Sequence, residues 1–158
     1  MKTMIDLYKT EASAAFNSID SGDINKFVEL IIDAYKAEKT VFACGNGGNV
    51  ASVQNLVLDL NMHPFVSEDK SKRSGGRNKF KSVSLCDSAA TITGLTNDLG
   101  FENIFVEQLK YQCNPGDILF AMSGSGNSKN IVEALTYAKD HGIICVVMTR
   151  NRDTKADK

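Results

Sequence analysis

The chain has 158 residues, of which 42% are hydrophobic and 23% are charged, and its formal net charge is −1. A chain of this size can bury one compact core, so we expect a single domain over residues 1–158. The near-neutral charge excludes a global attraction to nucleic acid or an anionic membrane, and the sequence contains neither a membrane-spanning apolar stretch nor a secretion signal. We therefore expect a cytoplasmic protein that binds neither nucleic acid nor a membrane.

Two amphipathic helices are predicted at the amino-terminal end. Residues 4–19 and 24–36 carry apolar side chains at spacings of three and four. Asp23, in the polar joint between the two segments, is a candidate N-cap. Both helices precede the first strand and have no sheet face of their own to cover. We therefore expect the segment 1–37 to take part in oligomerisation.

From residue 40 onward, strand and helix patterns alternate. The predicted strands are 40–44, 82–86, 117–122 and 143–148, and the predicted helices are 48–61, 88–96, 102–112 and 127–140. The strands are almost continuously apolar, which indicates a parallel sheet buried on both faces. The predicted fold class is therefore α/β, an open parallel sheet with helices on both faces, preceded by the two N-terminal helices. Ligands of such sheets bind beyond the carboxyl ends of the strands.

A long polar loop over residues 62–81 interrupts this alternation. Its part from Lys70 to Lys81 contains the single aromatic residue Phe80 and the cations Lys70, Lys72, Arg73, Arg77, Lys79 and Lys81. A loop of this length is typically a functional flap or a disordered segment. Three interpretations stay open: a solubilising loop, a flap over an anionic substrate, and a contact surface for protein or nucleic acid. The lack of interleaved aromatic residues disfavours the third.

The four cysteines are widely spaced and form no CxxC pair. They are Cys44, Cys86, Cys113 and Cys145, and most of them sit inside or at the end of apolar runs. Such a pattern is typical of reduced cysteines that act as small core residues. We expect neither disulfides nor a thiolate metal site.

Two glycine-rich loops follow predicted strands and open predicted helices. They are Cys44-Gly45-Asn46-Gly47-Gly48-Asn49 and Ser123-Gly124-Ser125-Gly126-Asn127-Ser128. A loop of this kind aims backbone N–H groups and the positive end of a helix dipole at one spot, which favours a phosphate. Neither loop matches a dinucleotide or P-loop fingerprint, since Val50 and Lys129 stand where GxGxxG requires glycine. The pattern therefore predicts a small anionic ligand.

The serine hydroxyls of the second loop offer further hydrogen bonds to such a ligand. Ser123, Ser125 and Ser128 can join the helix-terminal N–H groups around the phosphate oxygens. The alternative is purely structural, because serine and asparagine are good N-caps and glycine turns the chain. The presence of two such loops in one small sheet favours the phosphate site.

Three strings together resemble one known family. They are Cys44-Gly45-Asn46-Gly47-Gly48, Asn97-Asp98-Leu99-Gly100-Phe101 and Ser123-Gly124-Ser125-Gly126-Asn127-Ser128. In this order they resemble the sugar isomerase (SIS) domain, and within it the sedoheptulose-7-phosphate isomerase group, over nearly the whole chain. The resemblance implies a flavodoxin-like three-layer sandwich, a phosphorylated sugar as substrate, and a homotetramer with shared active sites. The implied substrate-binding residues are Asn46, Gly47, Gly48, Asn49, Asn97, Asp98, Ser123, Gly124, Ser125 and Ser128.

The resemblance also implies acid–base chemistry. Interconverting a ketose and an aldose phosphate requires a base that takes a proton next to a carbonyl and an acid that returns it on the neighbouring carbon. Asp59 stands where the family carries a catalytic glutamate, and His63 is four residues further on, so both are candidate catalytic residues. Asp59 lies ~15 Å along the helix that starts at Asn49, which is too far to serve that helix's own N-terminus. We therefore expect it to act on a site formed with a neighbouring subunit.

Departures from the family pattern leave a second function open. Asn55 replaces a common histidine, and the family's C-terminal helix, with its glutamine and second catalytic histidine, has no counterpart before Lys158. The alternative is a non-catalytic SIS protein that binds a sugar phosphate or serves as a scaffold, similar to the replication initiator-associating proteins. We expect no cofactor. Zinc is the less favoured option, resting on the four-residue spacing of Asp59 and His63.

Overall fold

The computed structural model describes residues 3–72, 79–150 and 153–157. It divides into two compact units, Met1–Asp33 and Ala34–Lys158, which are described separately below. Arg73 and Arg77, two cations of the predicted polar loop 62–81, lie outside the described residues.

The first helix, α1, covers Met4–Asn17 and begins with a capping box. The Thr3 backbone N–H donates to the Asp6 carboxylate at 3.1 Å, and the Asp6 N–H donates to Thr3 Oγ1 at 3.2 Å. These two bonds satisfy backbone donors that the first turn of a helix otherwise leaves without partners. No side chain of α1 is buried, and Met4, Tyr8 and Phe16 are exposed. The amphipathic pattern of this helix is therefore not used within its own unit.

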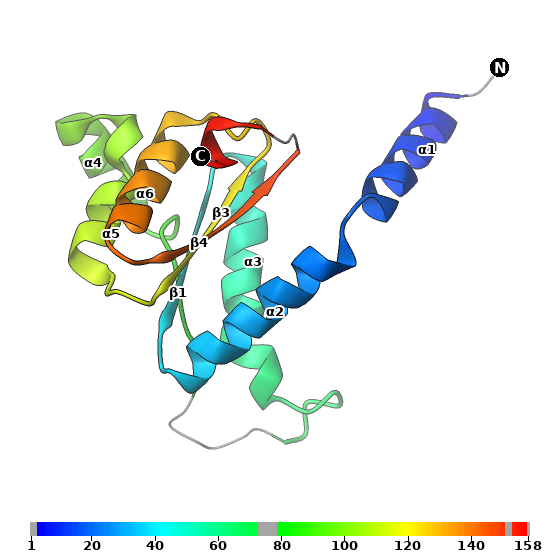
Figure 1. Ribbon diagram of the computed structural model, residues 1–158, viewed down its shortest axis with the longest axis horizontal. Helices are drawn as coiled ribbons and strands as arrows, with labels where there is room; N and C mark the ends of the chain where they lie inside the picture. The colour runs from blue at the N-terminus through cyan, green and yellow to red at the C-terminus, as the bar shows by residue number, and fades with distance from the viewer. Residues whose placement is uncertain (1–2, 73–78, 151–152, 158) are drawn as a thin grey trace. The chain divides into compact units, whose positions relative to one another are not determined.

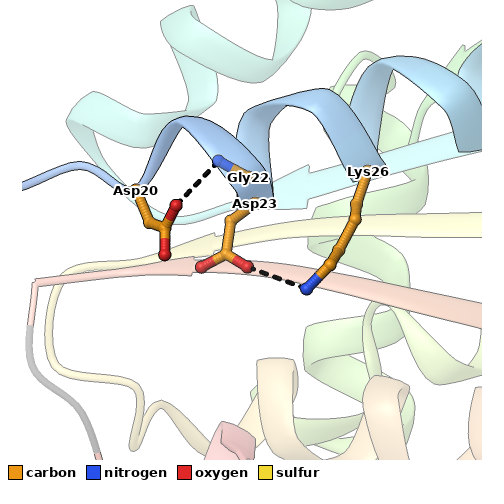
Figure 2. A network of polar contacts seen from close by, with 4 residues as sticks. All are labelled: Asp20, Gly22, Asp23 and Lys26. Carbon is orange, nitrogen blue, oxygen red and sulfur yellow. Dashed lines mark hydrogen bonds and ion pairs between the residues drawn. The ribbon is translucent and has the colours of Figure 1, made fainter.

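The second helix, α2, covers Ser21–Lys36 and is capped by Asp20. Asp20 Oδ1 accepts a hydrogen bond from the Gly22 N–H at 2.7 Å (Figure 2). The Asp20 carbonyl accepts a second one from the Asp23 N–H at 3.1 Å. Asp23 lies in the first turn, where its carboxylate is 3.5 Å from Lys26 Nζ. The prediction that Asp23 is the N-cap was wrong, because helical hydrogen bonding already starts at Asp20.

The second unit is built on a four-stranded parallel sheet with the order β2-β1-β3-β4. Figure 1 labels three of its strands, β1, β3 and β4. The strands are β1 (Thr40–Gly45), β2 (Lys81–Ser84), β3 (Ile118–Ser123) and β4 (Ile144–Thr149). This arrangement confirms the predicted fold class. The predicted strand 82–86 ends earlier, at Ser84, since the next two residues form a turn.

Helices cover both faces of this sheet. They are α3 (Gly48–Met62), α4 (Ala89–Leu99), α5 (Val106–Gln112) and α6 (Lys129–Asp140). The chain steps from β1 to β2 in one direction and from β2 through β3 to β4 in the other. Right-handed crossovers therefore place α3 on one face and α4, α5 and α6 on the other (Figure 1). None of the helices in the described part of the chain has the length and apolar character that crossing a bilayer requires.

Short 3₁₀ turns modify the predicted helices and loops. They are η1 (His63–Phe65), η2 (Phe101–Asn103) and η3 (Lys155–Asp157). The predicted helix 102–112 is divided into η2 and α5, and the predicted helix 88–96 continues to Leu99, where Gly100 ends it with a φ of 91°. The predicted loop 62–81 starts with η1 instead of irregular chain. Phe65 in η1 and Phe80 both pack on Tyr35, with ring centroids 6.0 and 4.8 Å away.

The core lies between the sheet and the helices α5 and α6. Its fully buried large side chains include Phe42, Phe105, Leu109, Leu119 and Ile131. At the amino-terminal edge of the sheet the buried Asp117 carboxylate accepts hydrogen bonds from the Thr40 N–H at 2.9 Å and the Asn114 N–H at 2.7 Å. These bonds tie the starts of β1 and β3 together, which helps to fix the register of the two strands that carry the glycine-rich loops.

All four cysteines are free thiols, but they are not equally buried. Cys44 is fully buried in β1, and burial raises the pKa of its thiol far above the usual value. Burial also raises the pKa of Cys86, whose Sγ donates to the Gly45 carbonyl at 3.5 Å. Cys145 is exposed, so its prediction as a core residue was wrong: it lies on β4, which is an edge strand with fewer covering groups.

The Cys44 thiol is expected to stay unmodified by iodoacetamide at pH 8 while the protein is folded. Only the thiolate reacts, and both burial and the raised pKa keep this group protonated. Mass spectrometry after labelling with and without urea measures the difference, with Cys145 as the exposed control. Labelling of Cys44 at the same rate in both conditions would contradict its burial.

Candidate functional site

Both glycine-rich loops lie at the carboxyl end of the sheet, on neighbouring strands. β1 pairs with β3 in parallel, and Gly45 lies opposite Met122 in this register. The loop after β1 leads into α3, and the loop after β3 leads into α6. The chain changes direction across the sheet between β1 and β3, which is the place where open α/β sheets bind ligands. The fold therefore brings the two loops to one position.

The first loop opens α3 without a side-chain cap. Gly47 occupies the N-cap position with a φ of 55°, a left-handed conformation that glycine adopts without strain. A Cβ added at Gly47, Gly48 or Gly124 would meet no atom within 4 Å. Open space thus adjoins both loops, and at α3 the helix dipole presents its positive end. Open space and the positive end of a helix dipole favour an anion beside the predicted positions Asn46, Gly47 and Gly48.

In the second loop, the three serine hydroxyls have different surroundings. Ser123 Oγ accepts from the Gly126 N–H at 3.1 Å, and Ser125 Oγ accepts from the Asn127 N–H at 3.2 Å. These two bonds support the turn, as the structural interpretation of the serines requires. Ser128 differs, because it stands at the N-cap of α6 without capping an amide, and its Oγ lies 3.4 Å from Ser123 Oγ. Its placement at the helix start favours a ligand contact over a capping role.

Side-chain amides connect the two loops. Asn46 Nδ2 donates to Asn130 Oδ1 at 2.9 Å, and Asn130 Nδ2 donates to Asn46 Oδ1 at 2.8 Å. Asn49 Nδ2 donates to the Met122 carbonyl at 3.4 Å. The predicted site residues Asn46 and Asn49 therefore make structural contacts across the β1–β3 pair.

A segment near the carboxyl end packs against the second loop. The Ala156 N–H donates to the Gly126 carbonyl at 3.0 Å, and the Lys155 N–H donates to Asn127 Oδ1 at 3.2 Å. Thr154, which precedes η3, is 6% exposed. No periodic pattern predicts this contact, since the segment is polar and short.

Asn97 and Asp98 lie at the carboxyl-terminal end of α4, away in sequence from both glycine-rich loops. Both side chains are exposed, and Asn97 Nδ2 donates to Asp98 Oδ1 at 2.8 Å. This hydrogen bond orients the pair on the surface. Their predicted contact with the sugar stays a prediction.

Asp59 and His63 form an ion-pair geometry at the end of α3. The His63 Nδ1 atom is 3.3 Å from Asp59 Oδ1, and Asn55 Nδ2 donates to Asp59 Oδ2 at 2.9 Å. Asn55, Asp59 and His63 are spaced by four residues and so share one face of the helix. Asp59 lies 11 residues after Gly48, or ~16 Å along the helix axis, so the structure does not bring it to the glycine-rich loops of its own chain.

The described residues contain no group of three or more His, Cys, Asp or Glu side chains that could hold a metal ion. Asp59 and His63 offer two donors, whereas a structural or catalytic zinc site uses at least three protein ligands. Their contact has the geometry of an ion pair, with 3.3 Å between His63 Nδ1 and Asp59 Oδ1.

Asn130 was not predicted as a site residue. It is 1% exposed, and with Ile131, Ala134 and Ala138 it belongs to the buried face of α6. The available signal was an amide at a position of an otherwise apolar stripe. Because a buried amide needs partners, such a position marks a specific tertiary hydrogen bond.

Residues 8–150 match the family model described as the SIS domain. The phosphoheptose isomerase of Crocosphaera subtropica is 31% identical over 137 residues, covering 87% of this chain and 65% of that protein. The phosphoheptose isomerase of Akkermansia muciniphila is 34% identical over 144 residues, covering 91% of this chain and 68% of that protein. The chain thus spans about two thirds of the length of these relatives.

Solved structures support the same grouping at the level of the fold. A phosphoheptose isomerase from Francisella tularensis has a TM-score of 0.82 at 22% identity, covering 99% of this chain and 80% of that chain. The parallel sheet, the two N-terminal helices and the paired glycine-rich loops agree with the sequence match. The chain belongs to the SIS domain family.

Proposed function

We propose that this protein is a sugar phosphate isomerase of the phosphoheptose isomerase type, which interconverts a ketose and an aldose phosphate by proton transfer. The observation that carries the proposal is the convergence of two glycine-rich loops at the carboxyl ends of β1 and β3. The relatives named phosphoheptose isomerase support it, since they match this part of the chain at 31% and 34% identity.

In this proposal the loops hold the phosphate and the sugar. The binding residues are Asn46, Gly47, Gly48, Asn49, Asn97, Asp98, Ser123, Gly124, Ser125 and Ser128. Backbone N–H groups at the start of α3 and α6 supply donors without a net charge, and the two helix dipoles add to them. No cofactor takes part in the proposed reaction.

Asp59 is proposed as the acid–base residue, with His63 as its partner. The carboxylate takes a proton from the carbon next to the carbonyl, and a protonated group returns it to the neighbouring carbon. The imidazole of His63 is within hydrogen-bonding reach and can stabilise the negative charge of Asp59 between turnovers. Because Asp59 is remote from the loops of its own chain, its substrate is held by a neighbouring subunit.

Shared active sites require an oligomer, and we propose a cytoplasmic homotetramer. The α1 helix supports this proposal, because none of its side chains is buried and it exposes Met4, Tyr8 and Phe16. Light scattering on the eluted peak of a gel filtration column measures the mass. A monomer at micromolar concentration would contradict the shared site.

The isomerase activity is tested in D₂O with sedoheptulose 7-phosphate and a panel of other ketose and aldose phosphates. Proton transfer through a solvent-exchangeable carboxylate introduces deuterium next to the carbonyl, which NMR detects even when little product accumulates. The tetrameric protein is expected to catalyse both deuterium uptake and interconversion. A tetramer that binds these compounds but exchanges no proton would exclude isomerase activity. The second candidate function, a non-catalytic sugar phosphate-binding protein, would then remain.

This second candidate is favoured by one observation, the separation of Asp59 from the phosphate-binding loops within the chain. A sensor or scaffold would need only the loops. Calorimetric titration with the same sugar phosphates distinguishes the two candidates, because binding without exchange identifies the sensor, and the absence of both argues against either function.

A further inference from the structure

The reciprocal hydrogen bonds between Asn46 and Asn130 join parts of the chain that are 84 residues apart. Asn46 directly follows β1, and Asn130 lies in the first turn of α6. Each amide donates one N–H and accepts with its oxygen, so the pair is matched in both directions. The pair therefore ties the first glycine-rich loop to the helix that the second loop opens.

Because Asn130 is buried, its side-chain amide depends on this contact for hydrogen bonds. It is 1% exposed, and its Oδ1 also accepts the Ile131 N–H at 3.0 Å. An amide buried in this way loses its water, so a missing partner leaves a donor or acceptor unsatisfied. By contrast Asn46 is half-buried, and its amide keeps one N–H that the pair does not use.

The contact also reaches the start of α3. The Asn46 carbonyl accepts a hydrogen bond from the Asn49 N–H at 3.1 Å, within the turn that opens that helix. Fixing the Asn46 side chain against Asn130 therefore fixes the position of the first N–H groups of α3. The two helix ends are held in one relative position by hydrogen bonds that do not depend on a ligand.

We propose that Asn130 is a positioning residue for the phosphate site, which orients Asn46 and holds the first loop against α6 without touching the ligand. The inference rests on the proposed function, because it assigns the two loops to one phosphate. Its physical reason is geometric: a displacement of about 1 Å in a binding group can cost on the order of a hundredfold in rate. Without Asn130 the first loop keeps its backbone turn and the long Asn49 Nδ2 bond to the Met122 carbonyl at 3.4 Å, but no side-chain bond to α6 through Asn46.

The test is a double-mutant cycle with the full chain, comprising Asn46→Ala, Asn130→Ala and the double variant. Affinities for inorganic phosphate and for sedoheptulose 7-phosphate are measured by calorimetric titration. Asn130→Ala is expected to weaken both by about tenfold, the size that one misplaced hydrogen-bonding group typically gives. In the Asn46→Ala background, the loss of Asn130 is expected to weaken binding no further, because its effect passes through Asn46.

Gln108→Ala is the matched control for a buried amide that serves the fold alone. Gln108 is 6% exposed and donates to the carbonyls of Leu85 at 2.9 Å and Ile104 at 2.8 Å. Its removal is expected to lower the melting temperature as Asn130→Ala does, with phosphate affinity unchanged. A purely structural Asn130 would behave like this control.

Three outcomes would overturn the inference. If Asn130→Ala leaves the phosphate affinity unchanged, Asn130 is not a positioning residue, but the proposed function is unaffected. The same holds if the affinity loss of the double variant is the product of the two single losses. An unsubstituted protein that binds neither phosphate nor any sugar phosphate removes the proposed function and the positioning role together.

A measurement on the unsubstituted chain keeps the inference testable if Asn130→Ala does not fold. The two side-chain amide protons that the pair uses, one from Asn46 and one from Asn130, are expected to exchange with water far more slowly than those of an exposed residue such as Asn25. Exchange as fast as that of Asn25 would show that the pair does not persist in solution and would end the proposal.

Discussion

Asp59→Asn is expected to lower the rate of sugar phosphate isomerisation by about 10²–10⁴-fold, the usual contribution of a positioned acid–base group. Asparagine has the same shape, and its oxygen can still accept the hydrogen bond that Asn55 Nδ2 donates to Asp59 at 2.9 Å. It cannot take a proton at neutral pH. The substitution should therefore lower kcat while KM and the melting temperature stay close to their original values.

Asp23→Asn is the matched control, because it makes the same change in another exposed carboxylate. The Asp23 carboxylate pairs with the exposed Lys26 at 3.5 Å (Figure 2), and surface pairs of this kind contribute about 0–1 kcal/mol. Its rate should match that of the unsubstituted protein. Equal rates for Asp59→Asn and the unsubstituted protein, in an active tetramer, would exclude Asp59 from the chemistry.

Gly126→Ala is expected to lower the free energy of unfolding by about 2–5 kcal/mol. Gly126 has a φ of 63°, where a residue with a Cβ is strained by about 1–2 kcal/mol. An added Cβ would also collide with the Thr154 side chain, and forcing extra atoms into a packed position costs about 1–3 kcal/mol. Urea denaturation measures the total. Phosphate affinity should fall as well, since the loop cannot keep its conformation.

Gly94→Ala is a control, because the same substitution is expected to raise the free energy of unfolding at this position. Gly94 is inside α4, and a Cβ there would meet no atom within 4 Å, so alanine should stabilise the protein by about 0.5–1 kcal/mol. Comparing Gly126→Ala/Thr154→Gly with Thr154→Gly separates the two causes, because both variants lack the Thr154 side chain and its hydrogen bond to Asp157 at 2.9 Å. The difference between them should be the backbone strain without the collision. A Gly126→Ala protein as stable as Gly94→Ala would contradict both.

The sheet was predictable from the sequence because its strands are short apolar runs that alternate with amphipathic helices. Thr40–Gly45 and Ile118–Ser123 match the predicted strands to within one residue at each end. Both glycine-rich loops were recognisable because glycine and serine cluster directly after these runs. Local composition determines such features, so a single sequence contains them.

The contacts that organise the site were not predictable in this way. Asn130 bonds to a residue 84 positions away, and Gly126 accepts a hydrogen bond from Ala156. Both contacts depend on which strands are neighbours, and periodicity carries no information about that. The N-cap of α2 was misplaced for a local reason, since Asp20 and Asp23 are equally good capping residues by type and only the backbone decides between them.

The packing of η3 on the second glycine-rich loop, Ser123–Ser128, gives a way to observe that loop directly. The Lys155 N–H is bonded to Asn127, while the Lys155 residue itself is exposed. An environment-sensitive fluorophore attached at position 155 would sit beside the loop without replacing any of its groups. If this loop holds a phosphate as proposed, the emission is expected to change when the anion binds, which would turn a fixed tertiary contact into an optical signal.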